Sequence, residues 1–213
     1  MSKITFSNDE FRCHLECDQC VFIKPDGQRC RNRVCIGYPV CWVHTKKEYG
    51  LRVKDSTIAE AGKGLFTLTG VENGEWICPY VGEQISQECL DARYPGDQTA
   101  PYAVADGQFV FGDFDDLVNE NIQGFIGSPY IDSACVRGVG AMANGLFRRD
   151  GRSRTAAVHN ATIDARPGYA GLWLRARKDI EPDSEIFVHY GPQYTLDDEH
   201  VTSRRQGIDT RPC

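Results

Sequence analysis

Apolar and polar side chains alternate over short stretches from residue 49 onward, and glycine, asparagine or aspartate separates these stretches. Alternation with a period of two is typical of β-strands, and the dipeptide Asn73-Gly74 marks a turn before one of them. Strands are predicted at residues 51–58, 64–68, 76–81, 102–105, 109–111, 130–132, 161–164, 172–177 and 185–190. Helical spacing is clearest over residues 86–94, where Ser86 is suited to cap the helix. The pattern therefore predicts a mainly β fold with few short helices.

The composition is that of a globular protein. The 213 residues are 41% apolar and 25% charged, which excludes wholesale disorder. No apolar run approaches the roughly 20 residues that cross a bilayer, and residues 1–10 lack the pattern of a secretory leader. We therefore expect no membrane partner. The 24 basic and 30 acidic side chains give a net charge of −6, which argues against nucleic acid as the main ligand.

The charge is divided unevenly along the chain. Residues 1–50 carry 8 basic and 6 acidic side chains, whereas residues 83–120 carry nine acids and one base, Arg93. The acidic stretch is either a solvated surface or a docking face for a basic partner. We expect the chain to divide into a Cys/His-rich module at 1–48, a larger domain at 49–195 with a variable insert at 83–128, and a polar tail at 196–213.

Six of the ten cysteines lie between Cys13 and Cys41, and two histidines, His14 and His44, lie beside them. A dense Cys/His cluster without a secretory leader is typical of a metal site in a reducing compartment rather than of a disulfide scaffold. We therefore expect an intracellular protein that binds metal through its N-terminal part.

The spacing Cys20-x9-Cys30-x10-Cys41-x2-His44 predicts a closed, tetrahedral zinc site, because four sulfur and nitrogen ligands without a carboxylate suit zinc. A module of this size has too little core to fold alone, so metal binding would supply the folding energy of residues 1–48, which we call the zinc module. The other candidate ligands are Cys13, His14, Cys17 and Cys35. They leave three alternatives open: a second zinc ion, a Cys17/Cys20 pair that displaces Cys30, or free thiols.

Four short motifs follow one another in the larger domain. They are AGKGLF at 61–66, GVGAMAN at 138–144, HNA at 159–161 and EIFVHYG at 185–191. The first is not followed by a predicted helix, so it is not the fingerprint of a dinucleotide site. In this order and spacing, over about residues 50–194, the chain resembles a SET-domain protein lysine methyltransferase.

The resemblance implies a SET-type β fold with a C-terminal pseudoknot and a bound S-adenosylmethionine. It implies that Tyr190 is the catalytic residue and that Asn160 holds the pseudoknot. The residues that it places around the cofactor are Gly62, Lys63, Gly64, Tyr94, Ala143 and Asn144. Candidates for the wall of the lysine channel are Tyr102, Phe109, Tyr130, Val188 and Ile163, and the three aromatic ones are equally suited to ordinary core. The two aliphatic residues would leave room for a second or third methyl group.

The sequence departs from the family pattern at several positions. Gly145 stands where the family usually has a histidine, and His189 replaces the common aspartate before the catalytic tyrosine. A long insertion separates Asn144 from Asn160, and we expect it to form an exposed basic loop. The family's cysteine triplet after the SET core is absent, since Cys213 alone cannot form that zinc site.

These expectations together predict methyl transfer from S-adenosylmethionine to the side-chain amine of a protein lysine. A desolvated, aromatic channel would lower the pKa of that amine so that it can attack. The acidic insert suits a basic target such as a histone tail, and a chromatin target would place the protein in the nucleus. Two alternatives are a catalytically inactive SET-like binding module and a nucleic-acid adaptor that works through the zinc module.

Overall fold

The computed structural model describes residues 4–7, 10–13, 17–34, 36–59, 61–94, 100, 102–105, 130–146, 158–169 and 171–190. Of residues 4–7 and 10–13 it describes the backbone. The strand predicted at 109–111, the loop at 147–157 and the tail after residue 190 lie outside this part of the chain. Among the described helices, none is long and apolar enough to cross a membrane.

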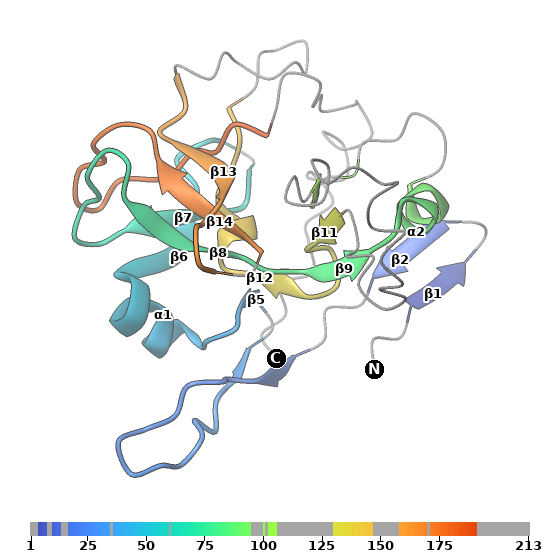
Figure 1. The fold of residues 1–213 in the computed structure, drawn as a ribbon, viewed down its shortest axis with the longest axis horizontal. Helices are drawn as coiled ribbons and strands as arrows, with labels where there is room; N and C mark the ends of the chain where they lie inside the picture. Colours follow the sequence, from blue (N-terminus) through green and yellow to red (C-terminus); the bar gives the residue numbers. More distant parts are fainter. Residues whose placement is uncertain are drawn as a thin grey trace.

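Short strands make up most of the described chain, together with two α-helices, so the predicted fold class is confirmed (Figure 1). The N-terminal elements are β1 (Ile4–Ser7), β2 (Glu10–Cys13), β3 (Asp18–Gln19), β4 (Arg33–Val34), β5 (Ile36–Tyr38) and α1 (Trp42–Tyr49). The elements that follow are β6 (Leu51–Asp55), β7 (Lys63–Thr67), β8 (Trp76–Tyr80), β9 (Glu83–Ile85), α2 (Gln87–Arg93), β10 (Ala103–Ala105), β11 (Tyr130–Asp132), β12 (Arg137–Gly138), the 3-10 helix η2 (Gly140–Met142), β13 (Ala161–Ala165) and β14 (Leu172–Ala176).

Three small antiparallel sheets build the larger domain. They have the orders β13-β14-β8, β6-β7 and β10-β11-β9. Alternate residues of β14 point to opposite faces, so Leu172 and Leu174 are buried whereas Arg175 is exposed. Most of the buried apolar residues of these strands form one cluster, which also includes Ile186. This cluster is the core on which the C-terminal motifs rest.

The strand predicted for residues 185–190 does not form as a ladder. The segment instead makes single bridges to three separate places, joining Phe66 to Glu185, Asn144 to Phe187, and Ala161 to Val188. It therefore runs between β7, the chain that follows η2, and the start of β13. Its apolar side chains, Ile186 and Val188, are buried in the core. The alternation that suggested a strand reflects burial by three different neighbours.

Helix α2 is confirmed at the predicted place. Ser86 is its N-cap and accepts a hydrogen bond from the backbone N–H of Cys89, and Tyr94 is its C-cap. Arg93 in its last turn is buried and contacts two carboxylates, Asp132 at 2.7 Å and Glu83 at 3.0 Å. Because these acids lie on β11 and β9, the ion pairs attach the helix to the β10-β11-β9 sheet.

Helix α1 was not predicted, because its sequence has no apolar face. Thr45 is its one buried residue, and the helix ends at Gly50, whose φ of 63° is easily adopted by glycine. The helix lies where the zinc module meets the larger domain (Figure 1). Nearby, β5 pairs with β12 in parallel, and Tyr49 packs against the apolar clusters of both parts. The zinc module is therefore joined to the larger domain by backbone pairing as well as by side chains.

Candidate functional site

The four predicted metal ligands come together in the zinc module. The Sγ atoms of Cys20, Cys30 and Cys41 and a ring nitrogen of His44 all lie within 4.8 Å of one another. The His44 Nδ1 atom is 3.3 Å from the Cys41 Sγ and 3.5 Å from the Cys20 Sγ. Ligands of a tetrahedral zinc ion are separated by roughly 3.3–3.8 Å, given bond lengths of about 2.0–2.3 Å. The spacing thus has the dimensions of a closed metal site.

Hydrogen bonds favour the thiolate form of one ligand. Burial raises the pKa of the Cys41 thiol, but the side chain of Asn32 and the backbone N–H groups of His44 and Val43 lower it by more, to about 6. Asn32 donates to the Cys41 Sγ at 3.3 Å. Cys41 is also the N-cap of α1, where backbone N–H groups point at an anion. In contrast, burial raises the pKa of the Cys20 thiol.

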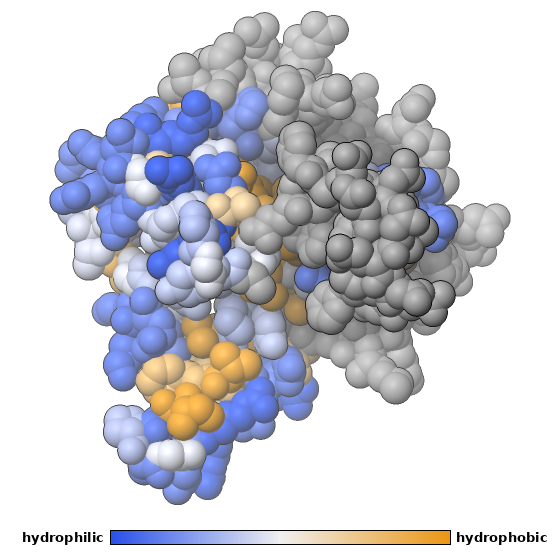
Figure 2. Space-filling model, in the orientation of Figure 1, coloured by the Kyte–Doolittle hydropathy of each residue, from blue (hydrophilic) through white to orange (hydrophobic). Residues whose placement is uncertain are grey.

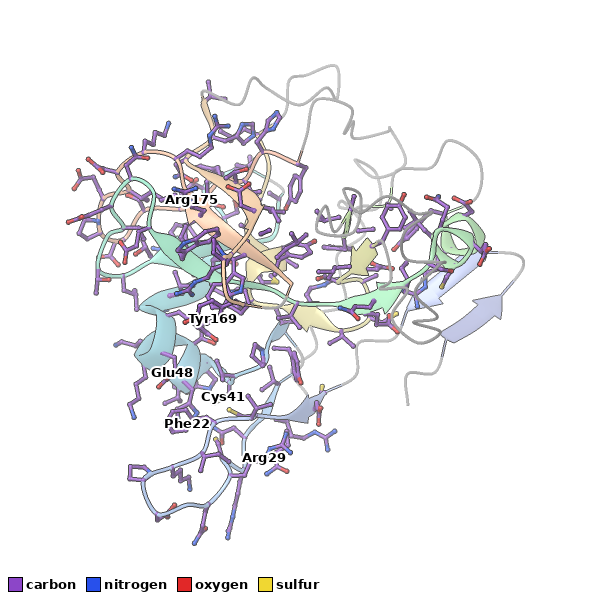
Figure 3. The ribbon with its side chains drawn as sticks, in the orientation of Figure 1. Phe22, Arg29, Cys41, Glu48, Tyr169 and Arg175 are labelled. Atoms are coloured by element: carbon purple, nitrogen blue, oxygen red, sulfur yellow. The ribbon has the colours of Figure 1, made fainter. Side chains whose placement is uncertain are left out.

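Aromatic packing holds the histidine ligand in place. The Phe22 ring stacks on the His44 ring with centroids 3.8 Å apart, and the Lys47 ammonium lies 4.8 Å above Phe22. In Figure 3, Phe22 and Cys41 lie together where the protruding loop of the module meets α1. Such outer contacts orient a metal ligand before the ion arrives.

The structure resolves one of the alternatives that the spacing left open. Cys30 is part of the cluster, and Cys17 is disulfide-bonded, so Cys17 does not displace Cys30. Cys135 is also disulfide-bonded. The sequence analysis expected metal ligands or free thiols rather than disulfides. Cys17 and Cys135 contradict this expectation. Cys13, His14 and Cys35 have no described side chains, and a second zinc ion stays a prediction.

A second group of polar residues forms where segment 185–190 crosses the larger domain. The Asn144 amide nitrogen donates to the Lys63 carbonyl at 3.0 Å, to the Glu185 carboxylate at 3.1 Å and to the Ser56 hydroxyl at 3.2 Å. The buried Glu185 carboxylate also accepts hydrogen bonds from Ser56 and from both the N–H and hydroxyl of Thr57. Asn144 and Glu185 thereby join the Gly-Lys-Gly turn to the C-terminal motif.

The two glycines of that turn are needed for different reasons. Gly62 has a φ of 71°, a conformation that other residues adopt only with strain. Gly64 has ordinary φ, but a Cβ atom there would lie 2.1 Å from the Glu185 carboxylate oxygen and 3.1 Å from the Asn144 amide nitrogen. The close approach of Glu185 to this turn therefore requires a glycine at position 64.

Tyr190 lies beside the same group. Its hydroxyl donates to the carbonyl of Ala143, the neighbour of Asn144, and its ring packs half-buried against the core. Asn160 fastens the chain that leads to Tyr190: its amide nitrogen donates to the Glu185 carbonyl at 2.8 Å, and its amide oxygen accepts from the Phe187 N–H at 2.7 Å. The Tyr190 hydroxyl is thus positioned by its own hydrogen bond to Ala143 and by the hydrogen bonds of Asn160 to the preceding backbone.

His189, which precedes Tyr190, lies against a second histidine. The rings of His189 and His159 meet edge to face with centroids 5.1 Å apart, and His159 Nε2 accepts a hydrogen bond from the N–H of Leu146. Burial, and then the positive charge of Arg177, lower the pKa of His189 below its usual range. A ring whose neutral form is favoured by burial thus stands where the family commonly has a negative charge.

The other predicted channel and cofactor residues divide between two places. Val188 donates its N–H to the Asn144 carbonyl at 2.9 Å, and Ile163 packs against the core on β13. The remaining tyrosines lie at the end of α2, on β11 and just before β10, and α2 lies across the molecule from β7 (Figure 1). Tyr94 donates to Asp132, Tyr130 donates to Gln87, and the Arg137 guanidinium covers the Tyr102 ring. Phe109 lies outside the described residues.

Comparison with known families identifies the larger domain. A family model of the SET domain matches residues 62–191, a span that begins at Gly62 and ends just after Tyr190. The chain belongs to the SET domain family. The predicted resemblance is therefore confirmed, and the Asn144–Glu185–Tyr190 group lies within the matched SET sequence. A comparison with curated proteins found no match.

Two solved structures are similar to this SET chain. The Neurospora SET domain protein DIM-5, a histone lysine methyltransferase, shares 20% identity with a TM-score of 0.47, and the alignment covers 69% of this chain and 54% of that one. The methyltransferase domain of human PR domain-containing protein 2 shares 13% identity with a TM-score of 0.45, covering 80% of this chain and 99% of that one.

Sequence reasoning missed Glu185, Ser56 and Thr57 as members of the site. Glu185 begins the fourth motif, which is the single signal that marks it. Ser56 and Thr57 follow β6 at an ordinary turn, and they reach Glu185 across 129 and 128 residues of chain. A contact of that sequence separation leaves no local pattern.

Proposed function

We propose that this chain transfers a methyl group from S-adenosylmethionine to the side-chain amine of a protein lysine, with a basic segment such as a histone tail as the substrate. The observation that carries the proposal is the placement of the Tyr190 hydroxyl on the Ala143 carbonyl, beside Asn144 and the Gly62–Gly64 turn. Membership of the SET domain family supports it. The net negative charge of the chain is complementary to a basic substrate.

The residues around the turn fit a cofactor of this kind. The exposed Gly62 and the missing Cβ at Gly64 let backbone groups approach a ligand closely. Because the Asn144 amide nitrogen is directed at protein acceptors, its side-chain oxygen would meet the ammonium group of the cofactor. S-adenosylmethionine, when bound, supplies an electrophilic methyl group on a sulfonium.

The chain itself would orient the lysine and favour the neutral form of its amine. Its amine must be neutral to attack, although its ordinary pKa is about 10.4. Removing the amine from water lowers that pKa, and the half-buried Tyr190 and the buried Val188 supply apolar surface at this place. The Tyr190 hydroxyl donates its hydrogen to Ala143, so its oxygen would accept a hydrogen bond from the amine and hold it in line.

For the zinc module we propose that Cys20, Cys30, Cys41 and His44 bind one zinc ion with a structural role. Four protein ligands close the coordination sphere and leave no position for a substrate. The ion would hold together a segment whose own apolar cluster is small.

The test is methyl transfer from labelled S-adenosylmethionine to core histones and to a cell lysate. We expect label on a protein lysine, and a loss of about 100-fold for Tyr190→Phe, because the amine is no longer oriented. Tyr169→Phe, which removes a hydroxyl from a half-exposed tyrosine after β13 (Figure 3), is the matched control and should keep full activity.

Calorimetry with S-adenosylmethionine separates the outcomes. Cofactor binding that survives in Tyr190→Phe while transfer is lost would support the catalytic role. A chain that neither binds the cofactor nor labels any protein would show that it is an inactive SET-like binding module instead.

A further inference from the structure

A cavity of about 430 Å³ lies where the zinc module meets the larger domain, which we now call the SET half. The cavity is separate from the Tyr190 site. Its apolar lining comes from both parts: Ile36 lies on β5, and Leu51 and Val53 lie on β6. This volume is in the range of ordinary ligand pockets, and such pockets occur preferentially between domains. We call it the junction cavity.

The side chains with charge at the junction cavity are both cations. Lys46 of α1 and Arg52 of β6 line it, no acidic residue does, and neither cation forms an ion pair within the described chain. Glu48 belongs to the same helix as Lys46, but helical spacing places it on another side of α1. The cavity therefore combines an apolar lining with uncompensated positive charge.

A large aromatic side chain stands at the edge of the junction cavity. Trp42 lines it and is 79% exposed, and helical spacing places Trp42 and Lys46 on one face of α1. Figure 2 shows hydrophobic surface gathered over the zinc module, where Ile23 and Val43 are exposed by 56% and 40%. Exposed tryptophan with nearby cations is typical of the energetically important centre of a protein interface.

We propose that the junction cavity binds an acidic peptide segment of a partner protein. A bulky apolar side chain of the peptide enters between Trp42 and Leu51, and carboxylates that flank it meet Lys46 and Arg52. The charge is opposite to that needed for the lysine substrate of the proposed methyl transfer, so this is a separate site for a separate ligand. Nucleic acid fits less well, because its bases are held by several stacked rings rather than by aliphatic side chains.

The test uses the full, zinc-loaded chain and a library of random short peptides displayed on phage. We expect the enriched peptides to combine at least one bulky apolar residue with several acids. A synthetic copy of the most enriched peptide, labelled with a fluorophore, is then titrated by anisotropy. Trp42→Ala should weaken binding about tenfold or more, as at other interface tryptophans, and Lys46→Gln and Arg52→Gln should each weaken it less and reduce its dependence on salt.

Arg31→Gln is the matched control, because Arg31 is an exposed cation of the same module that does not line the cavity. Melting temperature and zinc content show whether each variant is folded, and all four changes are at exposed positions. Peptides that bind Trp42→Ala and Arg52→Gln as well as the unchanged chain would overturn the proposal, as would enrichment of basic peptides. If the chain self-associates and the associated form no longer binds the peptide, a second copy of the chain rather than a partner fills the cavity.

Discussion

The zinc module and the SET half differ in what stabilises them. Among the described residues, the module buries Cys20, Cys30, Cys41 and two valines in its own cluster, whereas the SET half buries a much larger and almost wholly apolar cluster. Three of the module's five core residues are thus candidate metal ligands. The two parts thus differ in kind, because the core of the module consists mostly of candidate metal ligands and the core of the SET half is stabilised by the hydrophobic effect.

Metal removal should separate the two parts most strongly. We expect a chelator to unfold the zinc module, because binding of a structural zinc ion supplies on the order of 10 kcal/mol to such small modules. Hydrogen exchange followed by mass spectrometry should show fast exchange for α1 and β4, and unchanged protection for β14. Cys30→Ser should act like the chelator, and Cys89→Ser, a free cysteine on α2, is the matched control. Equal loss of protection in both parts would contradict the comparison.

Shortening a buried side chain of the SET core should destabilise the SET half and leave the zinc module unchanged. Leu174 on β14 is fully buried, so Leu174→Ala should cost about 3 kcal/mol through lost burial and the cavity left behind. Denaturant unfolding followed by tryptophan fluorescence measures this loss, while zinc affinity should not change. Val158→Ala, at a more exposed apolar position, serves as the control and should have a small effect. A changed zinc affinity in Leu174→Ala would mean that the two parts are coupled.

A smaller effect is expected at the polar group that Glu185 forms with Ser56, Thr57 and Asn144. Glu185→Gln keeps the size of the side chain but removes the charge that accepts hydrogen bonds from Ser56, Thr57 and Asn144. We expect a loss of about 1–3 kcal/mol in stability, since hydrogen bonds to a charged group are replaced. Binding of S-adenosylmethionine should weaken as well, because the Gly62–Gly64 turn loses a contact. Glu181→Gln, at an exposed turn, should change neither measurement.

The smallest expected effect is a pH dependence in the SET half. Burial, followed by the charge of Arg177, holds the pKa of His189 below the value of about 6.5 that it has in the unfolded chain. The unfolded chain therefore takes up a proton first as pH falls through 6.5, so this residue makes the folded state less stable at lower pH. Thermal melting as a function of pH should show a shallower decline for His189→Asn. An unchanged slope in that variant would contradict the assignment.

How far the site could be predicted from sequence depended on the distance between its members along the chain. Cys41 and His44 are separated by two residues, so their spacing alone indicates a shared metal ion. Ser86 and Tyr94 likewise bound a helix whose capping is a local property. Helix α1 was missed because its packing, rather than an apolar face of its own, makes it helical.

The contacts around Tyr190 could not be predicted, because they join residues that are far apart in the sequence. The fourth motif marks residues 185–191, but it does not show that Glu185 bonds Ser56 or that Asn144 bonds the Lys63 carbonyl. Nor does the sequence show that Tyr94, Tyr102 and Tyr130 lie in and around the β10-β11-β9 sheet and α2. These placements depend on how three small sheets pack around one core.

The sequence by itself determined the mainly β fold, the candidate metal ligands Cys20, Cys30, Cys41 and His44, and the membership of the SET domain family, because each follows from local spacing or from the order of short motifs. Only the tertiary structure decided that Glu185 and Asn144 hold the glycine turn against the chain leading to Tyr190, and that the junction cavity lies between α1 and β6. The physical reason is that buried hydrogen bonds and cavities form between segments brought together by the core, and such segments leave no common pattern in the sequence.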